Sequence, residues 1–324
     1  MDNLTHSLVG WALAETGLKH RSRKGLAACV LAANMPDIDV FFGWSPWAPL
    51  AMHRGFTHGL VGGVLLMPPL LAGLLYLLDR WQVRQGKVFK SGLAMRFGWL
   101  LGLCYLGALT HPLLDLQNVY AIQLLSPMSA RWFHSDGLFI ISPWLLAMLG
   151  TGLWLSRRRV RHGSRSPGRP AAAALAGVLG FIMLNIGISA LAWDAPRKSP
   201  AHVRPDRIFA SPEPLLFWRR DVIWRQDGQV VQGRYDPFRS LGSLAAQGEP
   251  VQDHMADPVV RRAAVASGEV VKFLAWSQIP VARIEVRGCS ATVTFGDARF
   301  SGPAVSRNFN TSATVPTLAP GCPR

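Results

Sequence analysis

Charged residues are scarce in this chain: they make up 16% of its 324 residues, whereas hydrophobic residues make up 49%. Acidic residues are the scarcer sign, with 19 aspartates and glutamates against 34 lysines and arginines. The start of the chain lacks a basic segment followed by a small-residue cleavage site, so we expect no signal peptide there. No internal repeat is visible. A composition so poor in charge favours a membrane protein over a soluble globular one.

The sequence contains several long apolar runs. Those long enough to cross a bilayer as helices are Leu60–Leu78, Leu93–Leu114, Leu138–Leu155 and Ala171–Trp193. Two shorter and more polar stretches, Leu4–Leu18 and Leu26–Phe42, either cross the membrane or pack inside a helix bundle. We therefore predict a multi-pass α-helical membrane domain over residues 1–194 with 4 to 6 membrane helices.

The basic residues lie in alternate connecting segments, namely 19–24, 80–96 and 157–169. Cytoplasmic loops of membrane proteins carry this excess of lysine and arginine. The net charge of +15 thus reflects membrane topology, and we expect no nucleic-acid partner. Anionic lipid headgroups are a compatible contact. The pattern predicts an inner-membrane location with everything after Trp193 on the extracytoplasmic side.

The apolar periodicity changes after Trp193. We expect a linker over 195–205, a small β-rich soluble domain over 206–302 and a flexible tail over 303–324. Apolar and polar residues alternate through Ala282–Arg287 and Ala291–Phe295, as in half-buried strands. Asp227-Gly228 stands between two short apolar runs and predicts a β-hairpin turn.

The chain has four cysteines. Cys29 and Cys104 lie in apolar segments, whereas Cys289 and Cys322 lie in the region predicted to be exported. A disulfide between Cys289 and Cys322 is compatible with that compartment, and two free thiols are an equally open alternative.

Histidines and aspartates gather near the predicted extracytoplasmic ends of the apolar segments. These residues are His6, Asp37, Asp39, His53, His58, His111, Asp115, His134 and Asp136. Imidazole and carboxylate are ligands of divalent metals such as zinc. We therefore expect a metal site at one rim of the membrane domain.

Three local patterns refine this expectation. In His53-Arg54-Gly55-Phe56-Thr57-His58, a turn at glycine lets both histidines converge, Thr57 orients an imidazole, and Arg54 offers a guanidinium fork for phosphate oxygens. Asp37 and Asp39 flank one apolar residue and can reach the same cation or two neighbouring cations. His111 and Asp115 share one face of a helix, deep enough in an apolar run to make an unpaired charge costly.

His134 and Asp136 are expected to contact the ligands or the substrate without binding metal. Four histidines and three aspartates exceed what one tetrahedral ion needs, so the sequence predicts two or more ions. We expect zinc, with manganese as the alternative.

This pattern resembles the inner-membrane metal-dependent hydrolases of the YdjM/YfhP type over roughly residues 1–156. Two positions depart from the family: Gly59 replaces a serine, and Ser142 stands where an aspartate is expected. The resemblance implies a multi-pass membrane hydrolase remotely similar to zinc-dependent phospholipase C and the P1-type nucleases. It implies a metal ligand set of His6, Asp37, Asp39, His53, His58, His111 and Asp115.

From these residues we expect hydrolysis of a phosphoester by metal-activated water, with an amphiphilic or lipid-like substrate. Asp37 or Asp39 would serve as general base, and Arg54 would steady the developing phosphoryl charge. A non-enzymatic sensor or scaffold, with a structural metal and a partner-binding β domain, is the main alternative. A transporter is disfavoured because the apolar runs hold few polar residues, Asn185 being the clearest. The sequence leaves the substrate and the oligomeric state open.

Overall fold

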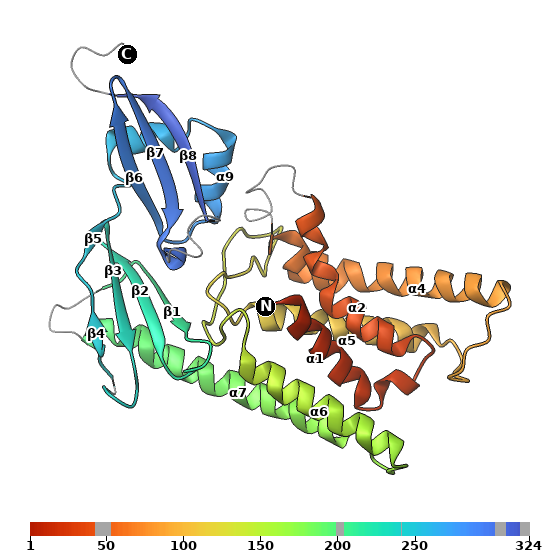
Figure 1. Ribbon diagram of the computed structural model, residues 1–324. Helices are drawn as coiled ribbons and strands as arrows, with labels where there is room; N and C mark the ends of the chain where they lie inside the picture. The colour runs from red at the N-terminus through yellow and green to blue at the C-terminus, as the bar shows by residue number, and fades with distance from the viewer. Residues whose placement is uncertain (43–52, 199–203, 241, 302–308, 318–324) are drawn as a thin grey trace. The chain divides into compact units, whose positions relative to one another are not determined.

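The computed structural model describes residues 1–42, 53–198, 204–240, 242–301 and 309–317. It divides into two compact units. The helical unit contains Met1–Asp39, Arg54–Gly187 and Pro214–Phe217, and the β-rich unit contains Val40–His53, Ile188–Glu213 and Trp218–Arg324. The order of helices first and antiparallel strands second confirms the predicted fold class (Figure 1).

Three helical stretches are long and apolar enough to cross a membrane within the described residues. They are Leu60–Arg84, Phe97–Asp115 and Arg169–Lys198. The first combines a π-helical segment, Leu60–Leu66, with helix α4, Met67–Arg84. Pro68 and Pro69 stand in the first turn of α4, directly after the π-helical segment. The second and third stretches contain helices α5, Phe97–Asp115, and α7, Arg169–Asp194.

The predicted span Leu138–Leu155 is replaced by a shorter apolar segment. Helix α6 begins at Pro143 and ends at Arg161, and its last turns carry the basic residues that follow Leu155. It is not among the three described stretches that are long and apolar enough to cross a membrane. Proline fixes the backbone at the first helical turn, so the apolar residues 138–141 precede the helix instead of extending it. Helices α6 and α7 run side by side (Figure 1).

The two short apolar stretches form helices α1, Asn3–Glu15, and α2, Gly25–Asn34. Asp2 caps α1 by accepting from the backbone N–H of Thr5 at 2.9 Å and from its hydroxyl at 2.6 Å. Helix α2 is followed by a 3₁₀ segment, η2, Met35–Phe42. Helix α1 packs with α6 and α7 in one apolar cluster, and α2 packs with α4 and α5 in a second.

Two glycines let α1 and α5 approach α2 closely. A Cβ atom added at Gly10 of α1 would lie 2.6 Å from the Cys29 carbonyl oxygen. A Cβ added at Gly107 of α5 would lie 2.5 Å from the same oxygen. Both distances are shorter than any normal contact, so α2 is held between two helix backbones and has no room to shift.

The β-rich unit contains two antiparallel sheets. The first has the strand order β1–β2–β3–β4, with β5 also paired to β3, and the second has the order β6–β7–β8. Their bounds are Arg207–Pro212, Arg220–Gln226, Gln229–Tyr235, Ala246–Gln247, Val251–Gln252, Pro280–Arg287, Ser290–Asp297 and Asn310–Pro316. Helices α8, Pro258–Ala263, and α9, Gly268–Trp276, lie between β5 and β6 in the chain.

The hairpin predicted at Asp227-Gly228 joins β2 to β3, and both turn residues have positive φ, 51° and 73°. The predicted flexible tail is wrong over Asn310–Pro316, which form β8. Thr311 and Val315 are buried along this strand, and its backbone pairs with β7 throughout. Cys289 is part of a disulfide, which was one of the two alternatives that the sequence left open, and Cys322 lies outside the described residues. Cys29 and Cys104 are free and buried.

A buried ion pair organises the end of β7. Asp297 accepts from Arg299 Nη2 at 2.8 Å, from the Ser277 hydroxyl at 2.6 Å and from the backbone N–H of Gln278 at 2.8 Å. Burial alone raises the pKa of Asp297, but the Arg299 guanidinium and these donors hold it below its ordinary value. The arginine also lies over the Phe209 ring of β1, 4.9 Å from its centroid, so it links the two sheets.

We predict that Gly107→Ala lowers the free energy of unfolding of the helical unit by about 1–3 kcal/mol, because the added methyl group collides with the α2 backbone. The matched control is Gly102→Ala in the same helix, where an added Cβ meets nothing within 4 Å. That control should be neutral or stabilising by up to about 1 kcal/mol. Thermal unfolding of the detergent-purified variants tests this, and equal midpoints would contradict the close packing.

Candidate metal centre

Four segments that are far apart in the sequence bring ligand-type side chains together at one end of the helical unit. His6 lies on α1, Asp37 and Asp39 on η2, and His58 at the end of a 3₁₀ turn, Phe56–His58. His111 and Asp115 lie in the last turns of α5. Candidate ligand atoms of Asp37, His58, His111 and Asp115 all lie within 4.8 Å of one another.

His58 is held between three carboxylates. Its Nε2 lies 3.2 Å from Asp37 Oδ1 and 3.4 Å from Asp115 Oδ2. Its Nδ1 lies 3.2 Å from Asp39 Oδ2. The two aspartates of η2 therefore lie beside opposite ring nitrogens of the His58 imidazole. Burial lowers the pKa of His58, but the bonds to Asp37 and Asp39 raise it overall above its ordinary value. A cation that binds Nε2 must displace this proton.

His111 has one nitrogen fixed and the other directed at the cluster. Its Nδ1 donates to the Ala33 carbonyl oxygen of α2 at 2.7 Å, which fixes the tautomer. Its Nε2 then lies 3.4 Å from Asp115 Oδ2 and 3.6 Å from Asp37 Oδ1. A metal-binding histidine commonly donates its second ring N–H to a carbonyl or carboxylate in this way. Because Gly107 lies one helical turn before His111, the close α2–α5 packing sets this bond.

His6 completes one wall of the cluster. Its ring stacks on that of His111 with centroids 4.0 Å apart, and its Nε2 lies 3.3 Å from Asp115 Oδ1. Burial and the neighbouring His111 lower the pKa of His6 to about 3, so the ring is neutral and keeps a lone pair.

The Asp39 carboxylate contacts several residues of segment 53–58. Its Oδ2 accepts from the Thr57 hydroxyl at 2.6 Å and from the Arg54 backbone N–H at 3.2 Å. These bonds fix the carboxylate that faces His58 Nδ1. Candidate ligand atoms of a second group, Asp39, His53 and His58, also lie within 4.8 Å of one another. Asp39 is therefore placed either to orient His58 or to bind a second ion.

The Arg54 side chain is buried, and its guanidinium contacts other buried residues of the site. Its Nε lies 3.4 Å from Asp115 Oδ2, and its Nη1 donates to Asn118 Oδ1 at 2.7 Å. The guanidinium also lies over the Tyr120 ring, 4.6 Å from its centroid. The α-amino group of Met1 forms a further contact with Asp115. The arginine expected to contact a phosphate thus compensates the charge of a candidate ligand.

Asn118 and Tyr120 are site residues that the sequence analysis missed. Asn118 Oδ1 also accepts from the Tyr120 backbone N–H at 3.0 Å, so one amide fixes both the loop after α5 and the Arg54 guanidinium. A lone asparagine in a loop gives no periodic or motif signal. The only sequence hint was its position three residues after Asp115.

His134 and Asp136 form their own pair, with Nδ1 and Oδ1 2.8 Å apart. The backbone beside them is tied to the end of α5, because the Ser135 N–H donates to the Leu116 carbonyl oxygen at 2.8 Å. Neither residue belongs to the two groups of candidate metal ligands among the described residues. Their position agrees with a supporting role next to the site, and that role stays a prediction.

The cluster contains buried polar atoms that have no hydrogen-bond partner within the described residues. They are both ring nitrogens of His6, Asp37 Oδ2, His111 Nε2 and Asp115 Oδ2. Such atoms cost free energy unless something satisfies them. All belong to residue types that bind divalent cations, and candidate ligand atoms of Asp37, His111 and Asp115 lie within 4.8 Å of one another. The residues present therefore fit a bound divalent cation.

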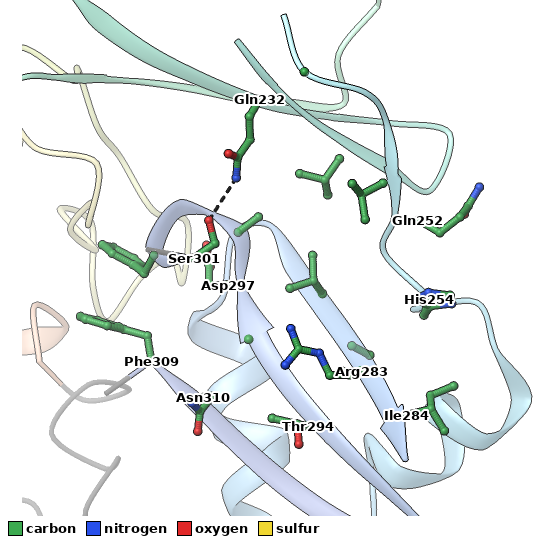
Figure 2. Close-up of a pocket in the computed structure, with 18 of the residues that line it drawn as sticks. Gln232, Gln252, His254, Arg283, Ile284, Thr294, Asp297, Ser301, Phe309 and Asn310 are labelled. Atoms are coloured by element: carbon green, nitrogen blue, oxygen red, sulfur yellow. Dashed lines mark hydrogen bonds between the residues drawn. The ribbon is translucent and has the colours of Figure 1, made fainter. Parts of the chain in front are cut away.

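A separate pocket of about 760 Å³ lies within the β-rich unit (Figure 2). It is lined by residues of β3, β5, β6, β7 and β8, and Gln232 donates to the Ser301 hydroxyl across it at 3.0 Å. Arg283 and His254 are its basic residues. No group of candidate metal ligands occurs there in the part of the chain that the structure describes.

Comparison with known proteins identifies a family for this chain. The model of one family, described as YdjM inner membrane protein, matches residues 1–193. The chain belongs to the YdjM inner membrane protein family. The match covers every candidate ligand and ends before strand β1, so both antiparallel sheets lie outside it. Neither the curated proteins nor the solved structures include a match. Family membership and the apolar helices together establish a membrane location.

We predict that added zinc or manganese raises the midpoint of thermal unfolding of the detergent-purified protein, because an ion that binds only the folded state stabilises it. His111→Ala should abolish that rise. The control His134→Ala removes an imidazole outside both candidate ligand groups and should keep it. A rise of the same size in all three proteins would place the ion elsewhere.

Proposed function

We propose that this membrane protein is a metal-dependent hydrolase that cleaves a phosphoester, with its site on the extracytoplasmic side. The observation that carries the proposal is the buried set of imidazole and carboxylate atoms that lack partners within the described residues. Mixed histidine and aspartate sets are used by hydrolytic metal centres.

Asp37, His58, His111 and Asp115 would hold the first ion, and His6 lies against His111 and Asp115 as a further ligand. A divalent cation supplies polarisation of a phosphoryl oxygen and lowers the pKa of water. Zinc suits this nitrogen and oxygen set, with manganese as the alternative. Asp39, His53 and His58 supply the donors for a second ion.

The remaining residues of the cluster orient and balance it. Asp39 fixes His58 through Nδ1 and is itself fixed by Thr57 and the Arg54 backbone. The Arg54 guanidinium offsets part of the negative charge of Asp115. Asp37 and Asp39 are each 8% exposed, whereas His58, His111 and Asp115 are fully buried. Water and substrate therefore approach on the aspartate side, where Asp37 or Asp39 can accept a proton.

The location favours an amphiphilic substrate. The ligands from α5 occupy the last turns of a helix that is long and apolar enough to span the membrane. A lipid-like molecule can keep its apolar part among the helices while its phosphoester reaches this end.

A structural metal site in a sensor or scaffold is the second candidate. The near-complete burial of the ligands supports it, because structural metal sites have closed ligand shells whereas catalytic sites keep an open position. Such a protein would use the β-rich unit to bind a partner.

An activity assay separates the two candidates. Purified protein loaded with zinc or manganese would be given a soluble chromogenic phosphodiester and, separately, a phospholipid in mixed micelles. The hydrolase account predicts metal-dependent release of product, with a loss of about 100-fold or more in Asp37→Asn, because it removes a ligand or base carboxylate. His134→Gln should retain more activity than Asp37→Asn. Bound metal that resists chelators, with neither substrate cleaved, would favour the structural site.

A further inference from the structure

The loop between β1 and β2 contains a run of large apolar residues, Leu215-Leu216-Phe217-Trp218, directly after Pro214. Hairpin connections that face water are normally polar. Leu215 is 64% exposed, although it is the first large apolar side chain of the turn. This sequence is unsuited to a loop in water.

Contacts within the helical unit fix the loop on two helices. The indole N–H of Trp144, in the first turn of α6, donates to the Leu215 carbonyl oxygen at 3.0 Å. The Phe217 ring lies 5.8 Å from the Trp144 ring and 4.9 Å from that of Phe181 on α7, centroid to centroid. The loop therefore lies at the level of Trp144 and Phe181.

The basic ends of both helices give the depth of that level. Along α6, Trp144 lies about 20 Å from Arg157 at 1.5 Å per residue. Along α7, Phe181 lies about 18 Å from Arg169 by the same rise. Arginines at the opposite ends of these helices mark one headgroup boundary. The hydrocarbon core is about 30 Å thick, so the loop lies about 10 Å short of the other boundary.

The surroundings of the loop fit hydrocarbon. Ile140, Ile141 and Trp144, which lead into α6, are 43%, 51% and 43% exposed. We call Ile140, Ile141, Trp144 and Leu215, which come from two chain segments, the apolar collar. Inside a bilayer a loop carbonyl needs a donor from the protein, and the Trp144 indole provides one for Leu215.

We propose that the β1–β2 loop, Pro214–Phe217, and the apolar collar are embedded in the acyl chains of the leaflet in which α6 begins. The occupant of this surface is phospholipid. The apolar part of α6 is too short to reach the second headgroup boundary. The embedded loop occupies part of the hydrocarbon layer between the start of α6 and that boundary.

The test places a fluorophore on a cysteine at Leu215→Cys in the full chain, reconstituted into phosphatidylcholine vesicles. The control is Glu285→Cys on β6, where the side chain is 60% exposed. A second embedded position, Ile141→Cys, is used if the first variant does not fold. Unsubstituted protein, whose free cysteines Cys29 and Cys104 are buried, gives the labelling background.

The proposal predicts that nitroxides on the lipid acyl chains quench the label at 215 and that aqueous iodide does not. The label at 285 should show the reverse. Iodide quenching at 215 equal to that at 285 would overturn the proposal. A label at 215 shielded from both quenchers would also overturn it, because the loop would then be covered by protein.

Discussion

The fold of the helical unit depends on keeping two buried carboxylates, Asp37 and Asp115, beside three imidazoles in an apolar setting. Two carboxylates this close repel each other, and burial penalises both. The Arg54 guanidinium, 3.4 Å from Asp115, offsets part of this cost from within the protein. Buried atoms of Asp37, His111, His6 and Asp115 still lack hydrogen-bond partners within the described residues. A bound divalent cation would satisfy the carboxylate oxygens together with one ring nitrogen of each histidine.

The helix packing serves this constraint. Gly10 and Gly107 bring α1 and α5 against the Cys29 carbonyl of α2, which places the Ala33 carbonyl one turn later against His111 Nδ1. The same close approach brings the His6 ring from α1 onto the His111 ring from α5. Small residues at helix contacts thus control the orientation of the imidazoles, so the geometry of the site and the stability of the bundle are linked.

Sequence patterns predicted the elements whose signal is local. The apolar runs indicated α4, α5 and α7, and Asp227-Gly228 indicated the β2–β3 hairpin. They could not predict where α6 begins, because the apolar residues 138–141 have the same composition as the helix, whereas Pro143 determines its first turn. The ligand types were visible from the sequence, but the pairing of Arg54 with Asp115 and Asn118 was not. That pairing depends on contacts between residues more than sixty positions apart.

We expect a divalent cation to bind among Asp37, His58, His111 and Asp115. X-ray absorption spectroscopy of the metal-loaded, detergent-purified protein, combined with elemental analysis, would detect it. At least one zinc or manganese ion per chain should be found, coordinated by nitrogen and oxygen atoms with the scattering signature of imidazole. His58→Ala/His111→Ala should lose that ion and its imidazole signature. A protein that takes up no divalent ion, or binds one equally well in the double variant, would contradict the account.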